Sequence, residues 1–316
     1  MNMRKWCVVL AAFSVACAVP TEPPPKEGFV DVIGGRIWYQ IMGSGHETPL
    51  VVIHGGPGAR SCGYLASLAQ LAESRPVIVY DQLGSGRSDR PSDTTLWSVS
   101  RFVDELSRLR EALDLEELHI MGHSWGGSVA VEYMLTKAPA GVRSLILAGP
   151  VIDTEQWIED TNELRTRLPE DVQAVLTAGE ESTDFDSPEY LAATDGFYAR
   201  FLVRSGWPQA DIPQCDGVGE FNMEVYEYMW GPEEFVATGT LREFDLTDRL
   251  HELHLPVMFI VGRYDEARPE TMFEFQRLIP GSVVEVIEDA AHVSMVDQPE
   301  RFNTVVGEFI AAVEAR

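Results

Sequence analysis

Apolar residues along the chain fall into two alternating patterns. Short runs that are apolar at nearly every position, as in buried strands, cover residues 49–53, 77–80, 118–121 and 144–148. Longer segments between them carry apolar residues at helical spacing, most clearly Val99, Phe102, Val103, Leu106, Leu109 and Leu113. Because strands that alternate with helices form parallel sheets covered on both sides, this pattern predicts an α/β fold with a mostly parallel central sheet and helices on both faces.

A β-hairpin is predicted ahead of the parallel strands. Residues 29–33 and 36–41 are strand-like, and Gly34 and Gly35 lie between them. Paired glycines between two such runs are typical of a tight hairpin turn. We therefore expect the sheet to begin with these two strands.

The strand pattern stops after Pro150. Residues 151–240 contain no strand-like run and are rich in acidic residues. Their aromatic residues lie at helical spacing and include Trp157, Phe197, Tyr198, Phe201, Tyr226 and Trp230. This segment is predicted to form a helical cap.

Strand-like runs return at 256–261 and 283–287, and a closing helix is predicted over 302–313. The cap is therefore an insertion into a core that the chain builds in two parts. We expect this core to comprise residues 28–150 and 241–316.

The N-terminal segment differs in composition from the rest. Arg4 and Lys5 precede an apolar stretch, residues 6–19, that is too short to span a bilayer. A basic head followed by such a stretch predicts a signal peptide over residues 1–18. The proline-rich residues 19–27 then form an extended spacer. The sequence therefore predicts an exported protein, either periplasmic or secreted.

The cysteines leave two questions open. Cys17 could instead accept a lipid, in which case the signal would be that of a lipoprotein and the protein would be anchored to a membrane. Loss of residues 1–18 removes two of the four cysteines and leaves Cys62 and Cys215. A disulfide between these two is allowed, but nothing in the sequence requires it.

The net charge of the 316-residue chain is −26. Such an acidic chain is not expected to bind nucleic acid, because neutralising phosphates requires clustered lysine and arginine. A solvated acidic surface explains most of this charge, and the alternative is that some carboxylates line a site for a cationic ligand. No cluster of His, Cys and carboxylate residues has the spacing of metal ligands, so we expect neither a metal nor a cofactor.

The sequence Gly122-His123-Ser124-Trp125-Gly126 directly follows a strand-like run and precedes a helical pattern that starts at Gly127. Gly-x-Ser-x-Gly in this context is the nucleophile elbow of α/β-hydrolases. Glycines are needed there because a Cβ at either end would collide with the neighbouring strand and helix. We therefore expect Ser124 to be a catalytic nucleophile.

A serine nucleophile needs a base and an acid that orients the base, in the chain order Ser, Asp or Glu, His. His292 follows the strand 283–287 and is the expected base, whereas His251 and His254 precede a strand and are expected at the surface or in packing contacts. Asp265 follows the strand 256–261 and is the expected acid. The competitors, Asp289 and Asp297, are too close to His292 along the chain to orient its ring.

The tetrahedral intermediate needs two hydrogen-bond donors for its oxyanion. One is the backbone N–H of Trp125, directly after the nucleophile. The loop after 50–53 reads His54-Gly55-Gly56-Pro57-Gly58, and the N–H of Gly56 is the expected second donor because proline has none. His54 is expected to hold this loop. The sequence from Asp81 to Asp89 is expected to be a tight structural turn beside the site rather than a phosphate loop.

These motifs together resemble the proline iminopeptidases (prolyl aminopeptidases), serine peptidases with the α/β-hydrolase fold. The resemblance rests on HGGPG at 54–58, the 81–89 turn, GHSWGG at 122–127 and GRYDE at 262–266, and it extends to the cap segments 187–190 and 230–235. Within the family, the chain looks closest to the tricorn-interacting aminopeptidase.

The resemblance implies a substrate and two further site residues. The family removes an N-terminal proline or small apolar residue from peptides or amides with a free N-terminus, and two glutamates bind the substrate amine. By position in the motifs these correspond to Glu234 and Glu266, and Glu233 and Glu224 are neighbours that could take the same role. An amino-acid amidase or an esterase with the same triad is the alternative enzyme. A non-catalytic binding protein with this fold is disfavoured by the intact triad.

Overall fold

An eight-stranded sheet forms the centre of the protein, with strand order β1-β2-β4-β3-β5-β6-β7-β8. The computed structural model describes residues 26–206 and 213–316. The predicted signal peptide, Cys17 and most of the predicted spacer lie outside these residues. The strands are β1 Glu27–Val32, β2 Gly35–Met42, β3 Leu50–Ile53, β4 Val77–Asp81, β5 Leu118–His123, β6 Val142–Ala148, β7 Val257–Gly262 and β8 Val283–Ile287.

Strand β2 is the antiparallel element of this sheet. It pairs with β1 on one side and with β4 on the other, both antiparallel. Gly34, in the turn between β1 and β2, and Gly35, the first residue of β2, have φ values of 98° and 156°, which residues with a side chain rarely adopt. The predicted hairpin is confirmed. The pairs from β4 through β3, β5, β6 and β7 to β8 are parallel, as predicted.

Helices cover both faces of the sheet because side chains alternate along each strand. Val51 and Ile53 pack with α2 (Val99–Ala112), α3 (Trp125–Lys137) and α8 (Pro269–Leu278). Leu50 and Val52 pack on the opposite face with α1 (Tyr64–Ser67) and α10 (Pro299–Glu314). The predicted fold class is confirmed. Shorter helices are η1 Ser61–Gly63, η2 Leu71–Glu73, η3 Thr94–Leu96, η5 Thr247–Glu252 and α9 Ser294–Asp297.

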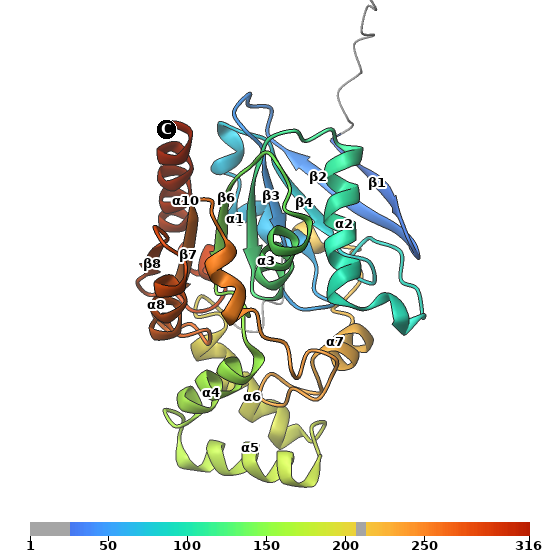
Figure 1. Ribbon diagram of the computed structural model, residues 1–316. Coiled ribbons are helices and arrows are strands. Elements are labelled where there is room, and N and C mark those ends of the chain that lie inside the picture. The colour runs from blue at the N-terminus through green and yellow to red at the C-terminus, as the bar shows by residue number, and fades with distance from the viewer. Residues whose placement is uncertain (1–25, 207–212) are drawn as a thin grey trace, which may run out of the picture.

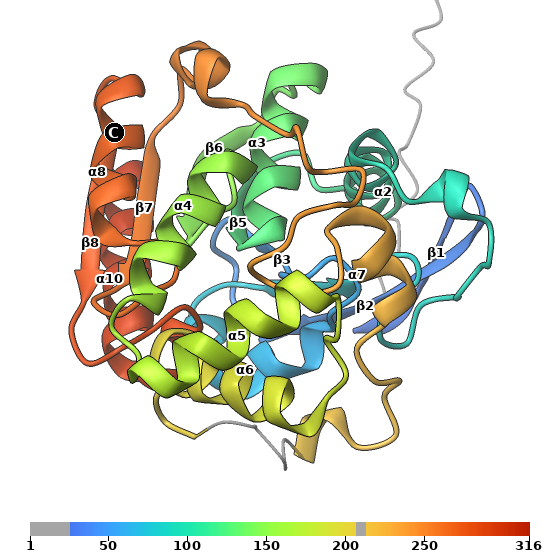
Figure 2. The same cartoon turned by 90° about the horizontal axis from the view of Figure 1, so that it is seen from below.

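Between β6 and β7 the chain leaves the sheet and forms a helical insertion, described over residues 151–206 and 213–240. Its helices are α4 Thr154–Arg165, α5 Glu170–Ser182, α6 Pro188–Phe201, η4 Pro213–Cys215 and α7 Met223–Met229. Figure 1 shows α4, α5 and α6 gathered at one end of the sheet, and Figure 2 shows α5 and α6 in front of that end. A separate apolar cluster, which includes Leu176, Tyr190 and Phe197, holds this group together.

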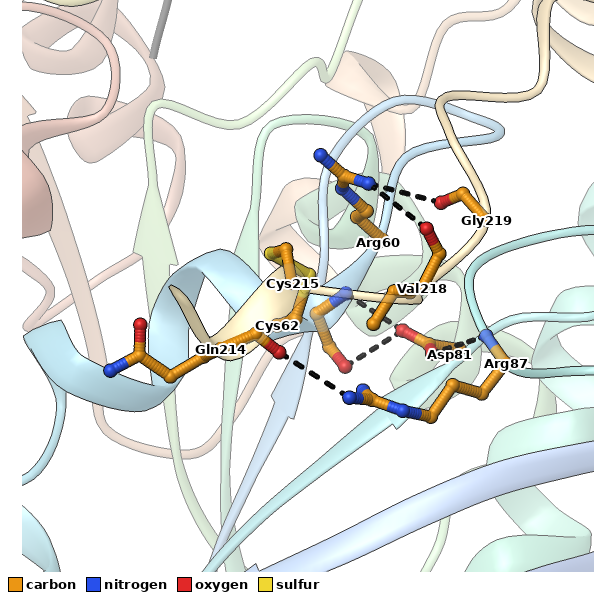
Figure 3. Close-up of a disulfide and its surroundings, with 9 residues drawn as sticks. Arg60, Cys62, Asp81, Arg87, Gln214, Cys215, Val218 and Gly219 are labelled. Atoms are coloured by element: carbon orange, nitrogen blue, oxygen red, sulfur yellow. Dashed lines mark hydrogen bonds between the residues drawn. A yellow bond between two sulfur atoms is a disulfide. The ribbon is translucent and has the colours of Figure 1, made fainter. Parts of the chain in front are cut away.

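A disulfide between Cys62 and Cys215 fastens the helical insertion to the core (Figure 3). The two cysteines are 153 residues apart in sequence, and their Cα atoms are 5.3 Å apart. Cys62 belongs to η1 and Cys215 to η4. Hydrogen bonds beside the disulfide add to this connection: Arg60 donates to the carbonyl oxygen of Gly219 (3.1 Å) and Arg87 to that of Gln214 (3.3 Å). The disulfide that the sequence left open is thus formed.

We expect reduction of this disulfide to lower the free energy of unfolding by about 2–5 kcal/mol, because the reduced chain gains the freedom of a long open loop when it unfolds. Denaturant unfolding of the oxidised and reduced protein measures the difference. A variant with Cys62→Ser and Cys215→Ser is the control, since a reductant should not change its unfolding midpoint. Equal midpoints for the oxidised and reduced wild-type protein would contradict the prediction.

Among the residues described, no helix has both the length and the apolar character needed to cross a membrane.

Candidate functional site

Ser124 lies at the tight turn between β5 and α3. Its φ of 53° and ψ of −124° are unusual for a residue with a side chain. The backbone N–H of Ser124 donates to the carbonyl oxygen of Ala148 (2.9 Å), which fixes the turn against the end of β6. The helix begins two residues earlier than its sequence pattern predicted, because Trp125 already belongs to α3.

The glycines of the elbow permit this close packing. A Cβ on Gly122 would lie 2.3 Å from the carbonyl oxygen of Gly126, in the first turn of α3. A Cβ on Gly126 would lie 2.3 Å from the carbonyl oxygen of Ile53, at the end of β3. Both distances are shorter than real Cβ contacts. A side chain at either position would therefore collide with the helix or with a strand, as expected from the sequence.

Asp265 and His292 form a buried pair at the same end of the sheet. The Nδ1 atom of His292 is 2.7 Å from Oδ1 of Asp265, and the residues are 2% and 1% exposed. The carboxylate also accepts hydrogen bonds from the backbone N–H groups of Ala267 (2.8 Å) and Gly262 (3.3 Å). Since Asp265 only accepts hydrogen bonds when ionised, Nδ1 of His292 carries the proton and Nε2 is left to act as a base.

The competing residues lie elsewhere. Asp289 is exposed at the surface, and Asp297 accepts hydrogen bonds from the backbone N–H groups of Arg204, Ser205 and Ala291. His251 and His254 are exposed, as expected. The structure therefore brings together the acid and base chosen from the sequence.

Ser124 and His292 line one cavity of about 630 Å³ between the carboxyl ends of the strands and the helical insertion. This volume is in the usual range for a small-molecule site. Aromatic side chains of the insertion contribute to its wall: Tyr198, Tyr226 and Trp230. Three further apolar residues that line the cavity, Leu191, Phe221 and Met223, are also exposed to solvent.

Gly56 and Trp125, the expected oxyanion donors, also line the cavity. Gly56 has a φ of 96°, a conformation that suits glycine. The loop before it is fixed by His54, whose Nε2 accepts a hydrogen bond from the backbone N–H of Gln82 (3.0 Å). Burial lowers the pKa of His54, so its imidazole is neutral and can accept this bond. His54 has the loop-holding contacts that were expected.

Gln82 helps to hold the expected oxyanion donors in place, and no sequence motif predicts this role. Its side-chain amide donates to the carbonyl oxygen of His54 (3.0 Å) and accepts from the indole N–H of Trp125 (2.9 Å). It therefore connects the two segments that carry the expected oxyanion donors. Nearby, Asp81 accepts hydrogen bonds from Ser61 and from the backbone N–H of Arg87, which gives the 81–89 segment the contacts of a structural turn (Figure 3).

Gly149 is a second residue of the site that no sequence motif identifies. Its φ is 49°, and a Cβ there would lie 2.8 Å from Nδ1 of His292 and 3.0 Å from Oδ2 of Asp265. Only glycine leaves room for the Asp265–His292 pair at the end of β6. The sequence signal for this close approach is a glycine directly after a buried strand.

Three carboxylates of the cavity lie close to His292 or to one another: Glu233, Glu234 and Glu266. The carboxylate of Glu234 accepts hydrogen bonds from the indole N–H of Trp157 and from the hydroxyl of Tyr226, both at 2.9 Å. Glu266 is 1% exposed, and its Oε1 lies 3.8 Å from Nε2 of His292. Its Oε2 is buried without a hydrogen-bond partner. Glu224, the other neighbour considered, is exposed and does not line the cavity.

Burial raises the pKa of all three carboxylic acids. The pKa of Glu233 rises to about 7, first through burial and then through the charge of Glu234. The pKa of Glu266 rises well above its usual value through burial and through the charges of Glu234 and Asp265. Burial also raises the pKa of Glu234, although the Tyr226 hydroxyl opposes the change. A cavity with several carboxylates whose ionisation is penalised favours a cationic ligand.

Within the described part of the chain, no group of His, Cys, Asp and Glu residues has the geometry to hold a metal ion.

Comparison with known proteins agrees with this geometry. A sequence model of the alpha/beta hydrolase fold family matches residues 48–299. A proline iminopeptidase from Heyndrickxia coagulans is 44% identical over 288 residues, which cover 91% of this chain and 99% of that protein. A proline iminopeptidase from Saccharolobus solfataricus is 32% identical over 292 residues, covering 91% of this chain and 93% of that protein.

Solved structures show the same relationship. The crystal structure of proline iminopeptidase from Mycobacterium smegmatis superposes with a TM-score of 0.82 at 32% identity, covering 92% of this chain and 99% of that chain. The crystal structure of VinJ superposes with a TM-score of 0.83 at 34% identity, covering 92% and 100% of the two chains. The chain belongs to the proline iminopeptidase family of the α/β-hydrolase fold.

Proposed function

We propose that this protein is a serine aminopeptidase that releases an N-terminal proline or small apolar residue from short peptides or amides. The observation that carries the proposal is a single cavity lined by Ser124, by His292 with Asp265 bound behind its ring, and by a set of buried carboxylates. The first three residues supply acyl-transfer chemistry, and the carboxylates supply a binding site for a protonated α-amine. The similar proline iminopeptidases support the same activity.

In the proposed reaction, the Oγ atom of Ser124 attacks the carbonyl carbon of the first residue while Nε2 of His292 takes the hydroxyl proton. Asp265 holds the other ring nitrogen and stabilises the imidazolium that forms. The backbone N–H groups of Gly56 and Trp125 receive the oxyanion. The imidazolium then donates its proton to the leaving amine, and water activated by His292 hydrolyses the aminoacyl-enzyme.

The carboxylates select substrates with a free N-terminus. Glu234 is held by Trp157 and Tyr226, whereas Oε2 of Glu266 is buried without a hydrogen-bond partner. An ammonium group between these side chains would give that oxygen a charge-assisted hydrogen bond in a partly dry site. The helical insertion acts as the cap over this site, and its aromatic residues Tyr198 and Trp230 form part of the wall for the first side chain.

A panel of arylamides tests the activity. Proline, alanine and leucine arylamides with free amines are compared with their N-acetylated forms and with simple acyl esters. The proposal requires turnover of free-amine substrates and loss of that turnover on acetylation, because an acetylated amine carries no charge. Equal rates for free and acetylated substrates would instead indicate an esterase or a general amidase.

The proposed location is outside the cytoplasm. The Cys62–Cys215 disulfide supports it, since disulfides form and persist in oxidising compartments. Membrane attachment would require a lipid on Cys17. Mass spectrometry of the mature N-terminus from a fractionated host decides among cleavage near residue 18, lipidation and retention of the segment.

The raised pKa values predict that binding of a cation releases protons. A bound ammonium stabilises ionised carboxylates and so lowers their pKa values. Glu233, whose pKa is about 7 without a bound cation, would then lose its proton at or below neutral pH. The contribution of Glu233 to this release disappears as the pH rises above about 7, because its carboxyl group is already ionised there.

Calorimetry with L-prolinol, a cation without a carbonyl group, measures this release in two buffers of different ionisation enthalpy. The apparent binding heat should differ between the buffers at pH 6.5 for the wild-type protein. The difference should be smaller for Glu233→Gln. Identical wild-type heats in both buffers would contradict the prediction.

A further inference from the structure

The side chains of Tyr64 and His123 connect two separate parts of the site. The backbone N–H of Gly55 donates to the hydroxyl oxygen of Tyr64 (3.2 Å), and this hydroxyl lies 2.9 Å from Nδ1 of His123. On the other side of the ring, Nε2 of His123 lies 3.1 Å from the backbone carbonyl oxygen of His292. A continuous chain of hydrogen bonds therefore runs from the loop before Gly56 to the backbone of His292.

The direction of each hydrogen bond in this chain is fixed. The carbonyl oxygen of His292 can only accept, so the proton of the His123 ring is on Nε2. In a neutral imidazole Nδ1 is then an acceptor, and the Tyr64 hydroxyl must donate to it. The oxygen of Tyr64 is left to accept from Gly55. Each polar hydrogen in the chain has an acceptor, and one arrangement satisfies all of them.

Both side chains stay uncharged during the reaction. Burial, followed by the charge of His292, lowers the pKa of His123 well below its usual value. Burial raises the pKa of Tyr64 to about 12. Their rings also meet edge to face with centroids 5.7 Å apart, and the His123 ring lies 4.6 Å from that of His292. This series of hydrogen bonds is therefore a fixed support, and it does not exchange protons with the base, His292.

We propose that Tyr64 and His123 are positioning residues, which hold the Gly55–Gly56 loop and the backbone of His292 in register with Ser124. The proposal builds on the proposed function, since it assumes that Gly56 supplies an oxyanion donor and His292 the base. His123 directly precedes Ser124 in the chain, so one ring fixes three parts of the machinery at once. Displacement of such groups by about 1 Å can cost about 100-fold in rate.

Three substitutions separate the two arms of the chain of hydrogen bonds. Tyr64→Phe keeps the ring and removes the hydroxyl. His123→Gln can keep a donor for the carbonyl oxygen of His292 while losing the acceptor for Tyr64. His123→Asn can keep that acceptor while losing the donor. Tyr133→Phe is the matched control, because it removes the hydroxyl of another buried tyrosine, which lies on α3 outside the cavity and accepts a hydrogen bond from Arg110 of α2 (3.4 Å).

We expect kcat to fall about 10- to 100-fold in Tyr64→Phe and in His123→Gln. The inhibition constant of L-prolinol should stay within about twofold of wild type, because prolinol has no carbonyl that needs the oxyanion donors. The double variant Tyr64→Phe/His123→Gln should be no slower than either single variant, since both break the same link. Tyr133→Phe should keep the wild-type kcat.

Several results would overturn the proposal: a wild-type kcat in Tyr64→Phe, multiplied losses in the double variant, or the same loss in Tyr133→Phe. The proposal would also be overturned if the inhibition constant of L-prolinol rose in proportion to the fall in kcat, because that would indicate general damage to the cavity. If the wild-type protein hydrolyses esters but no free-amine substrate, the proposed function fails on its own. The same variants then test the positioning role with ester turnover.

Discussion

Replacing Ser124 with alanine should lower kcat for a prolyl arylamide by about 10⁶-fold, and His292→Ala should have a similar effect. Ser124 supplies the attacking oxygen, and without the ring of His292 that oxygen remains a protonated and weak nucleophile. Asp265→Asn should cost about 10⁴-fold, because an amide at this position can donate to Nδ1 and so favours the wrong tautomer. Steady-state rates per mole of folded protein measure all three losses.

These losses should not multiply. The double variant Ser124→Ala/His292→Ala should be no slower than either single variant, because the two residues act in the same step. A fluorophosphonate should label the wild-type protein at Ser124 and should not label Ser124→Ala. Retention of a tenth of the wild-type kcat in Ser124→Ala would show that another residue is the nucleophile. The folded state of each variant is checked by its thermal unfolding.

The residues of the proposed triad could be chosen from the sequence because each follows a strand that has a strong local pattern. Parallel strands bring their carboxyl ends to one edge, so the residues after β5, β7 and β8 had to meet there. Ser124, Asp265 and His292 are those residues. The glycines at 122 and 126 added an independent sign, since their spacing suits only a tight strand-to-helix turn.

The connections among loops could not be predicted in the same way. The contacts of Gln82 with His54 and Trp125 join loops that follow three different strands, and no local pattern records which loop side chains face one another. The pairing of Cys62 with Cys215 likewise depends on how the helical insertion meets the core, across 153 residues of sequence. Glu233, Glu234 and Glu266 could be named from motif positions, but their differing hydrogen bonds depend on the packing of the insertion.

Glu234→Gln removes the charge of this side chain and should lower kcat/KM for free-amine substrates roughly thirty- to several-thousand-fold. This corresponds to a loss of about 2–5 kcal/mol of transition-state stabilisation. The glutamine keeps the size of the side chain but leaves the substrate ammonium without its full counter-charge in a buried site. Glu266→Gln should produce a loss in the same range. Because Glu266 lies 3.8 Å from Nε2 of His292, its replacement should also alter the pH dependence of kcat.

The contrast between charged and uncharged substrates separates binding of the amine from damage to the triad. Glu234→Gln should hydrolyse a simple acyl ester within a few-fold of the wild-type rate, since an ester without an amine makes no use of the carboxylate. Glu224→Gln is the matched control, because Glu224 is exposed on α7 and lies outside the cavity, and it should leave both activities unchanged. If Glu234→Gln and Glu266→Gln both cleave free-amine arylamides at the wild-type rate, these carboxylates do not bind the amine. If Glu234→Gln loses ester and arylamide turnover equally, its role is to support the triad and not to recognise the substrate.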